Sequence, residues 1–505
     1  MVKKLFSFRC SDAFARRRVF VLTRLNTTFP RLHRKQMPDL YSLQLIVVFI
    51  VVLFWMTFPV SARANNAIHG LVTDAQNSPL DGVEIHLDGV AVKTKSDGRF
   101  RWVIPERHTG KIPLTFTKLG YAPQTVTVEA GNTSNNAVNV TLVSTGDPQV
   151  GYKLTKVTIE PEVLSIIADK WGDKFKHVEY PNQYFDTIKT VEPGDDIQSA
   201  IDSANSAGGG IVFLKAGTHT VNSGLKLRSK VTLCGEGRTK TIVKQGSSMR
   251  GSILSQGSSP LTDVVLKDIT FQGNESRRAG GLNLRGNNSN RHTRFMFQNV
   301  TITGFGSHGV GISRINNVIM DNSVFQRNGS SGSLHHNVYF LYVTGVLQSD
   351  CDMSYPVTGK SNKYTSTSHV LAQRCILKEG HTNGIQADHE QAGYLFFHKY
   401  HMSGFKRVAM WFPCEDYRDK HTYKEDPKYA PQNVILNRCE IVDNTWGAMW
   451  RAVNNSYVIN SHFANDKIDM GLLKCDVSME NSTFEKGNEI YTDVKQWPSD
   501  VKILW

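Results

Sequence analysis

Residues 191–214 read VEPGDDIQSAIDSANSAGGGIVFL, and the prediction of the fold starts from this stretch. Asp195 or Asp196 is a candidate N-cap, because an aspartate there accepts hydrogen bonds from the first backbone N–H groups of a helix. The short amphipathic helix that follows ends at Gly208–Gly210, and Ile211–Leu214 begins a strand. The stretch therefore predicts a short helix that leads directly into a β-strand.

Beyond this stretch one pattern recurs: apolar strand positions, then two residues, then Asn, Asp or Gly. Its anchors step by 31, 23, 52, 64, 22 and 21 residues and are Phe271, Ile302, Phe325, Leu377, Ile441, Phe463 and Phe484. Steps of 21–23 residues match one rung of a parallel coil, and repeats of nearly constant length are typical of solenoids. The two long steps must then hold about two rungs each, with loop excursions at 348–368 and 412–432.

The passage Val191–Gly237, which continues through Ala216–His219 and Val231–Gly237, resembles the opening turns of the pectin-lyase-like superfamily. Members of that superfamily are right-handed parallel β-helices in which such a helix caps the open end of the coil. The resemblance implies this fold for residues 187–505. It does not imply one activity, because the superfamily includes lyases and hydrolases.

An earlier segment, residues 65–146, shows short alternating strands with turns about every ten residues, which is typical of a β-sandwich. The motif I-x-G-x-V-T-D from Ile68 to Asp74, with T-K-S-D-G-R-F from Thr94 to Phe100, resembles the carboxypeptidase regulatory-like family. That resemblance implies a small Ig/prealbumin-like sandwich that serves as a spacer or docking module. No paired acids, metal cluster or nucleophile indicate a reaction in this segment.

Together these patterns predict an all-β protein: a small N-terminal β-sandwich followed by a right-handed parallel β-helix. Residues 147–186 connect the two, with one helix expected near Pro161–Trp171. Residues 1–64 precede them as a targeting segment.

The targeting segment centres on Leu43–Val60, an apolar run of 18 residues followed by Ala62-Arg63-Ala64. Small residues at 62 and 64 suit cleavage by a signal peptidase, whereas 18 apolar residues also suffice for a retained membrane anchor. Both alternatives place the protein outside the cytoplasm, so we expect a secreted, periplasmic or cell-surface location.

Charge and cysteine content exclude two classes of function. Residues 1–64 hold eleven basic and two acidic residues, so only +4 of the +13 net charge belongs to the remaining 441 residues, which argues against a nucleic-acid partner. The seven cysteines include no CxxC pair, which argues against a zinc site. They are expected to be small core residues, with disulfides as the alternative. A monomer is expected.

The strands that follow each Asn, Asp or Gly turn are expected to stack into one sheet. They are Gly309–Arg314, His336–Tyr342, Gly384–Glu390, Val408–Pro413, Gly447–Arg451 and Lys467–Met470. Alternation along these strands sends one set of side chains outward, where they suit a sugar chain lying across the rungs. The expected substrate-binding residues are Asn337, Tyr339, Gln386, Trp411 (or Met410 in the other register) and Arg451. An ordinary solvated sheet face is the alternative.

Titratable residues are densest between Lys378 and Arg418. Asp388 and Glu390 lie two apart in an expected strand, so they would share one face and hold Ca²⁺ or act as an acid–base pair, unless they form a solvated acidic edge. We expect the catalytic residues to be Asp388, His389, Lys399 and Arg407. Residues Lys360, Lys363 and Tyr364 fall in the first excursion and are expected to roof the site.

Many enzymes of the resembled superfamily cleave acidic polysaccharides by β-elimination, which needs a base at C5 and a positive group beside the uronate carboxylate. The function predicted from the sequence is therefore an exported polysaccharide lyase acting on a uronate-rich chain. A C5-epimerase, a glycoside hydrolase and a non-catalytic polysaccharide-binding or adhesive β-helix are the alternatives. The usual Asp-Asp pair of the hydrolase branch does not precede Ser307-His308-Gly309.

Overall fold

The computed structural model describes residues 67–491 apart from short segments, and the predicted targeting segment with its apolar run lies outside this range. The segments not described are 88–89, 104–109, 119–120, 131–135, 145–153, 258–259, 277–278, 333, 391, 417–421 and 424–425. Within the described residues, no helix combines the length and apolar character needed to cross a membrane.

Two small sheets form the N-terminal sandwich. One has the order β4-β1-β7, with β8 also pairing β1, and the other has the order β3-β2-β5-β6. Their strands are β1 (Ala67–Asp74), β2 (Glu84–Leu87), β3 (Val90–Lys93), β4 (Arg99–Val103), β5 (Gly110–Thr117), β6 (Gln124–Ala130), β7 (Asn136–Ala137) and β8 (Val140–Leu142). Alternating side chains such as Ile68, Ile85 and Phe116 are fully buried in one shared core, which confirms the predicted β-sandwich.

Helix α4 (Ile197–Ser206) begins the coil, as the opening stretch predicts. Asp196 is its N-cap: the Asp196 carboxylate accepts hydrogen bonds from the backbone N–H groups of Gln198 (2.9 Å) and Ser199 (3.2 Å). Ile197 and Ile201 point into the core, so the helix closes the open end of the apolar interior. Such a cap removes an exposed strand edge.

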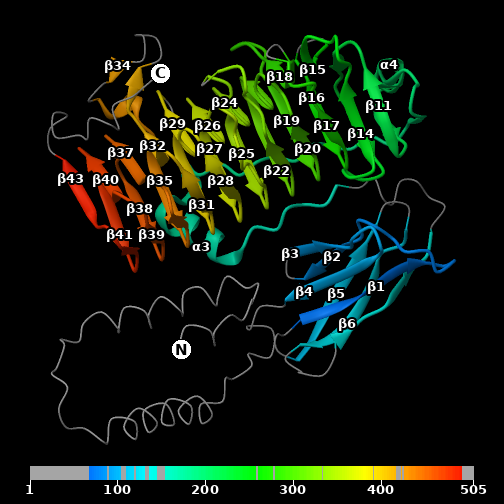
Figure 1. Cartoon of the computed structure of the whole chain (residues 1–505), viewed down its shortest axis with the longest axis horizontal. Coiled ribbons are helices and arrows are strands. Elements are labelled where there is room, and N and C mark those ends of the chain that lie inside the picture. The colour runs from blue at the N-terminus through cyan, green and yellow to red at the C-terminus, as the bar shows by residue number, and fades with distance from the viewer. Residues whose placement is uncertain are drawn as a thin grey trace, which may run out of the picture. The chain divides into compact units, whose positions relative to one another are not determined.

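Three parallel faces make up the β-helix (Figure 1). The 12-stranded sheet contains β9 (Ile188–Val191), β10 (Gly210–Leu214), β13 (Val231–Gly235), β16 (Thr262–Lys267), β19 (His292–Gln298), β22 (Ile315–Asp321), β25 (Thr344–Ser349), β27 (Ser368–Gln373), β30 (Gly393–His398), β35 (Gln432–Asn437), β38 (Ser456–Ile459) and β41 (Val477–Glu480). The 11-stranded sheet contains β12 (Leu225–Leu227), β15 (Gly251–Gln256), β18 (Ala279–Arg285), β21 (Val310–Ser313), β24 (Val338–Leu341), β26 (Asn362–Thr365), β29 (Ile385–Asp388), β32 (Val408–Phe412), β37 (Trp446–Arg451), β40 (Ile468–Leu473) and β43 (Asn488–Tyr491).

The third face is split into two five-stranded sheets. The first holds β11 (Gly217–Val221), β14 (Thr241–Gln245), β17 (Thr270–Gln272), β20 (Thr301–Thr303) and β23 (Val324–Gln326), and the second holds β28 (Ile376–Gly380), β31 (His401–Phe405), β36 (Glu440–Val442), β39 (His462–Ala464) and β42 (Thr483–Phe484). All seven repeat anchors belong to this face and occupy equivalent positions on successive rungs, as the repeat predicts, with β31 and the Asp352 bridge supplying rungs that have no anchor.

The connector covers the outer face of the 12-stranded sheet. Helix α3 (Pro161–Lys170) confirms the predicted helix and buries Val163 and Ile167. These residues pack on outward apolar side chains of the coil, including Leu371 and Phe396. The face that a polysaccharide could reach is therefore not this sheet, and the 11-stranded sheet becomes the candidate.

One of the two predicted excursions is wrong. Segment 348–368 is a complete rung, since Asp352 bridges both Val324 and Ile376 and β26 pairs with β24 and β29. Strand β26 reads NKYT, so its polar side chains hide the alternation that identified the other strands. Segment 412–432 does leave the coil and contains β33 (Glu415–Asp416), β34 (Thr422–Tyr423) and the short helix η2 (Pro427–Tyr429).

The six cysteines in the described part of the chain are free thiols, all buried except the partly exposed Cys475. Their place in the core supports the core-residue interpretation over disulfides.

Candidate active site

A row of outward side chains crosses the middle of the 11-stranded sheet. Tyr339, Lys363, Gln386 and Trp411 occupy one register position on β24, β26, β29 and β32. Their sequence neighbours, such as Phe340 and Ala387, point into the apolar core. The alternation that predicted Tyr339, Gln386 and Trp411 as outward residues is therefore correct, and Met410 points inward.

Asp388 lies two residues beyond Gln386 on β29, where it pairs with Thr365, and it is fully buried. Its Oδ2 lies 3.3 Å from the Nζ of Lys363 and accepts a 2.6 Å hydrogen bond from the Gln386 amide, while its Oδ1 lies 3.4 Å from the Nε2 of His389. We call Tyr339, Lys363, Gln386, Asp388 and His389 the Lys363 cluster. Burial opposes ionisation of Asp388, but Lys363, His389 and Gln386 outweigh it and lower the pKa of this carboxyl. Asp388 is therefore a charged group that holds Lys363 in place.

The end of strand β29 explains how Asp388 and His389 reach the same place. His389 has a φ of 73°, so the strand stops there and the side chain turns back over the carboxylate. The backbone N–H of His389 donates to the carbonyl of Tyr429 (3.1 Å), which anchors the 412–432 excursion on the strand end. Glu415, at the start of that excursion, contributes negative charge that helps raise the pKa of Lys363.

Two lysines three residues apart have opposite electrostatic environments. Burial acts against the charge of Lys363, yet Asp388, Tyr339 and Glu415 together raise its pKa, so it stays an ammonium. Burial, the Lys363 charge and Arg407 lower the pKa of Lys360 to about 7. Neighbouring groups with pKa values driven apart are typical of acid–base sites. Lys360 is also partly exposed, whereas Lys363 and Asp388 are buried.

Three histidines flank the cluster on the preceding rungs. The ring of His308 lies 5.1 Å from that of His335, 5.3 Å from that of His336 and 5.3 Å from that of Tyr339. His308 lies over Gly311, where an added Cβ would come within 3.4 Å of its ring, so the absent side chain leaves room for the imidazole. The Lys363 Nζ lies 5.9 Å from the centre of the Tyr339 ring, which links the imidazoles to the Lys363 cluster.

The other two predicted binding residues on this face have different surroundings. Trp411 belongs to an outer apolar patch with Val408, Trp446, Met449, Ile468 and Leu473. Arg451 is on β37 at the position equivalent to Leu473 on β40 and is 7% exposed. Arg407 precedes β32 and lies close enough to Lys360 to help lower the pKa of that lysine, and its catalytic role stays a prediction.

The prediction that Asn337 faces the substrate does not fit its position. Its side chain is fully buried at a corner of the coil, where its amide donates to the carbonyls of Met353 (3.1 Å) and Ser354 (3.0 Å). Its Oδ1 accepts from the amide of Asn328, which lies at the other end of the same turn, between β23 and β24. Asn337 satisfies backbone groups at the turn before β24, where the alternation of the strand has not begun.

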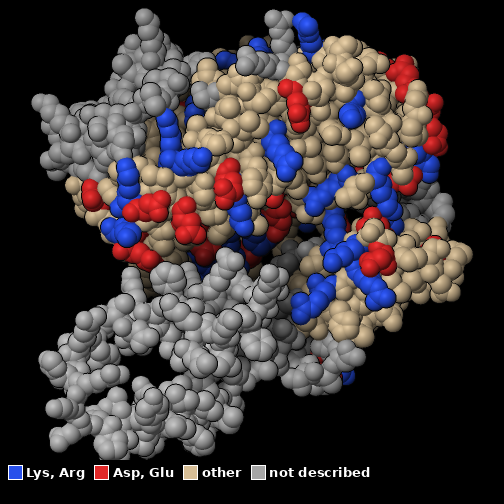
Figure 2. All heavy atoms as spheres, viewed as in Figure 1, with Lys and Arg blue, Asp and Glu red and all other residues tan. Residues whose placement is uncertain are grey.

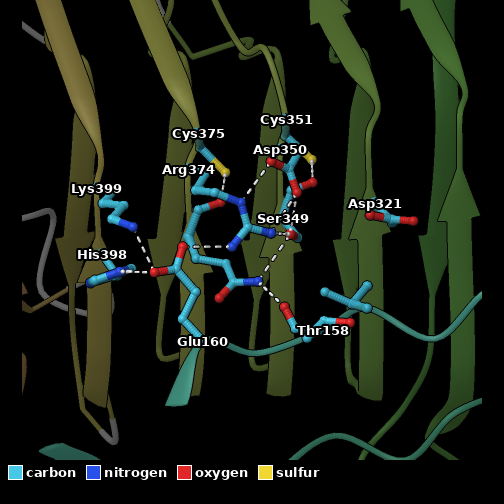
Figure 3. A network of polar contacts seen from close by, with 12 residues as sticks. Thr158, Glu160, Asp321, Ser349, Asp350, Cys351, Arg374, Cys375, His398 and Lys399 are labelled. Carbon is cyan, nitrogen blue, oxygen red and sulfur yellow. Dashed lines mark hydrogen bonds and ion pairs between the residues drawn. The ribbon is translucent and has the colours of Figure 1, made fainter. Parts of the chain in front are cut away.

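Lys399 also lies outside the site, at the corner between β30 and β31. Its Nζ lies 2.6 Å from Glu160, which lies just before helix α3 (Figure 3). Arg374 and His398 contact the same carboxylate at 3.0 Å and 3.2 Å. Hydrogen bonding from His398 and Lys399 and their charge overcome burial and lower the pKa of Glu160. The network holds the connector against the coil. In it Lys399 contacts Glu160 and not Asp388.

Neither of the two acidic sites described next has surroundings that suit a metal ion. The prediction that Asp388 and Glu390 share a strand face is wrong, because the strand ends at Asp388, and the Asp388 carboxylate faces an ammonium where Ca²⁺ would need several oxygen ligands. Glu160, Glu162 and His398 bring ligand atoms within 4.8 Å of one another. Three cations already contact these two glutamates, however: Lys399, Arg374 and Arg438.

The sequence pointed to Asp388 and His389 but not to the role of Lys360, Lys363 or His308. The sequence predicts a loop at both lysines because the NKYT strand that contains Lys363 and follows Lys360 carries no apolar alternation. The step of 52 residues between Phe325 and Leu377 predicts an additional rung there, but it does not show which residues form the strand of that rung. Over the face shown in Figure 2, acidic and basic side chains are interspersed, so no broad charged surface marks a site by itself.

Comparisons with known proteins agree with the two folds. Residues 67–143 match the carboxypeptidase regulatory-like domain, and residues 193–274 match the rhamnogalacturonase A/epimerase, pectate lyase-like family. These matches confirm both resemblances noted from the sequence. Each covers less than a fifth of the 505 residues, so they identify two segments and not the whole chain.

Similar proteins include an alginate lyase and mannuronan C5-epimerases. Alginate lyase 7 of Azotobacter vinelandii is 33% identical over 97 residues (17% of this chain, 11% of the relative), and mannuronan C5-epimerase AlgE4 of the same organism is 34% identical over 95 residues (17% of each). The chain thus matches only a small part of these relatives. The solved A-module of mannuronan C-5 epimerase AlgE6 from A. vinelandii aligns with a TM-score of 0.40 at 17% identity, covering 57% of this chain and 70% of that one.

Proposed function

We propose that this protein is an exported enzyme that acts on an acidic, uronate-containing polysaccharide by removing the proton at C5 of a uronate. The observation that carries the proposal is the pair of lysines on one rung: the pKa of Lys360 is lowered to about 7, whereas Asp388 beside Lys363 helps to raise the pKa of that lysine. Removing a proton next to a carboxylate needs both a neutral base and a nearby cation. The names of the partly matching relatives support the choice of substrate class.

In the proposed reaction the neutral amine of Lys360 takes the C5 proton. Arg407 and the field of Lys363 stabilise the negative charge that develops on the uronate carboxylate, and Asp388 positions Lys363 for this role. In the elimination, the electron pair of the C5–H bond forms the C4–C5 double bond. The C4–O bond breaks, and the leaving oxygen takes a proton from the Tyr339 hydroxyl, the partly exposed member of the cluster. An epimerase would instead return a proton to C5 on the opposite face.

A panel of alginate, polygalacturonate and glycosaminoglycans tests this function. Elimination creates a conjugated double bond that absorbs in the near ultraviolet, whereas hydrolysis creates reducing ends without that absorbance. Epimerisation creates neither and is read by proton NMR of the sugar ring. The proposal predicts, on at least one polymer, either absorbance that rises with time or a change of configuration at C5 in the NMR spectrum, and it predicts that this signal is lost in Lys360→Met. Reducing ends without absorbance, or no change in any polymer, would overturn it.

The sandwich is proposed as a spacer or docking module, because none of the residues of the Lys363 cluster belongs to it. An extracellular, periplasmic or cell-surface location is part of the same proposal, since a polysaccharide of this class lies outside the cytoplasm.

A further inference from the structure

His308, His336, Lys360 and Asn383 occupy one equivalent position on four successive rungs. Each lies two residues before the first of the paired residues Val310, Val338, Asn362 and Ile385. At three of these four positions the side chain accepts a hydrogen bond from the backbone N–H one rung further on. His308 Nδ1 accepts from His336 (3.0 Å), His336 Nδ1 accepts from Lys360 (3.0 Å) and Asn383 Oδ1 accepts from Val408 (3.3 Å).

These hydrogen bonds determine the tautomer of both imidazoles. A nitrogen that accepts a backbone N–H carries no proton, so in each neutral ring the proton must be on Nε2. The structure keeps both rings neutral: burial and the charges of His335, Lys363 and Arg285 lower the pKa of His308 to about 3, and burial with the charge of Lys360 lowers the pKa of His336 well below its ordinary value. The rings of three titratable residues in the described part of the chain lie against the His308 ring: His335, His336 and Tyr339.

Two other roles for His308 are excluded by the same hydrogen bond. A metal on Nε2 would move the proton to Nδ1, where the His336 N–H already points at 3.0 Å. A base acting through Nε2 would need that nitrogen to be unprotonated. What remains is an uncharged N–H donor, partly exposed on the outer face beside Tyr339.

We propose that His308 is a substrate-binding residue whose Nε2–H donates to a hydroxyl or carboxylate oxygen of the sugar next to the one that reacts at Lys360, with His336 as its positioning residue. The identity of the sugar bound at this subsite rests on the proposed function. Its neutrality has a consequence: binding through His308 does not weaken as pH rises through about 6.5, where an ordinary histidine loses its charge.

Two substitutions separate the donor from the structural hydrogen bond. In His308→Asn the Oδ1 can replace Nδ1 and accept the His336 N–H, but the Nε2 donor is lost. In His308→Gln the amide nitrogen can replace the Nε2 donor. His462→Asn is a control, because that histidine is exposed on the second five-stranded sheet, away from the site.

The measurement is the dissociation constant of the full chain for alginate and for polygalacturonate by affinity electrophoresis, at about pH 5.5 and about pH 8. We expect His308→Asn to weaken binding about fivefold to tenfold at both pH values, as for loss of one hydrogen bond, with an unchanged melting temperature. His308→Gln should retain most of the affinity and His462→Asn all of it.

Three results would overturn the subsite: wild-type affinity in His308→Asn, a His308 contribution present only at the lower pH, or no wild-type binding to either polymer. Lys360→Met distinguishes this proposal from the catalytic one. If the wild type turns over none of the polymers, but its binding depends on His308 and is unchanged in Lys360→Met, the subsite stands while the proposed reaction fails.

Discussion

The Nζ of Lys363 lies 3.3 Å from the Oδ2 of Asp388, and both residues are buried, although they project from the outer face of the coil. Each carries charge that the other stabilises, which raises the pKa of Lys363 and lowers that of Asp388. A buried ion pair contributes little net stability compared with apolar residues of similar size, but removing one partner leaves an uncompensated charge. The pair therefore has a functional consequence: it keeps one ammonium in a defined place.

Asp388→Asn should lower stability by about 3–5 kcal/mol, because it leaves the Lys363 ammonium buried without its carboxylate. This reverses the expectation for an outward strand residue, which would change stability by about 0.5 kcal/mol. Thermal or urea unfolding measures the effect. The double variant Asp388→Leu with Lys363→Met is the control and should recover much of the loss while remaining inactive. A single variant as stable as the wild type would contradict the burial of this pair.

The same pair gives stability a pH dependence. The pKa of Asp388 is lower in the folded protein than in the unfolded chain. Its contribution is therefore complete above the unfolded value of about 3.9 and is lost as pH falls through the folded value. Urea midpoints of the wild type should fall between about pH 4 and about pH 2 more steeply than those of the double variant. Parallel curves for the two proteins would argue against an ionised Asp388.

Lys360 should determine the rising limb of the pH–rate profile. Its pKa of about 7 in the folded protein lies below the ordinary value of about 10.4, so its amine becomes neutral as pH rises through about 7. We expect kcat/KM to rise over that range and then level off. Lys360→Arg keeps the charge at all pH values and should lose about 10²–10⁴ in rate. A variant with unchanged turnover would place the base elsewhere.

Lys399→Ala should leave turnover unchanged and lower only stability. Its Nζ contacts Glu160, far from Asp388 along the rung, and the contact fastens the connector to the 12-stranded sheet. Glu160→Gln is the matched change on the other side and should cost more stability, since Glu160 also contacts Arg374 and His398. Melting temperatures and kcat of both variants check this. A loss of kcat in Lys399→Ala without unfolding would return this lysine to the active site.

Removal of residues 65–146 should leave kcat/KM on soluble polymer within about tenfold of the full chain, because none of the residues of the Lys363 cluster comes from the sandwich. Turnover of the shortened chain, with circular dichroism to confirm that the β-helix is folded, provides the measurement. A larger loss in a folded protein would show that the sandwich contributes to catalysis.

The sequence by itself determined the architecture, because a solenoid is built from local repetition. The helix cap at Asp196, the apolar anchors such as Phe325 and Phe463, and the alternation along β24 and β29 are properties of short segments. For the same reason the outward positions of Tyr339, Gln386 and Asp388 could be counted from the sequence.

Only the tertiary structure decided which titratable groups meet. The rung holding Lys360 and Lys363 has polar strand residues, so its pairing with β29 is visible only once neighbouring rungs stack. Lys399 and Asp388 are eleven residues apart in sequence but on different corners of the coil, whereas Lys363 and Asp388 are 25 apart and in contact. Contact in a β-helix depends on the number of residues in each rung, and loops such as 412–432 change that number without leaving a periodic signal.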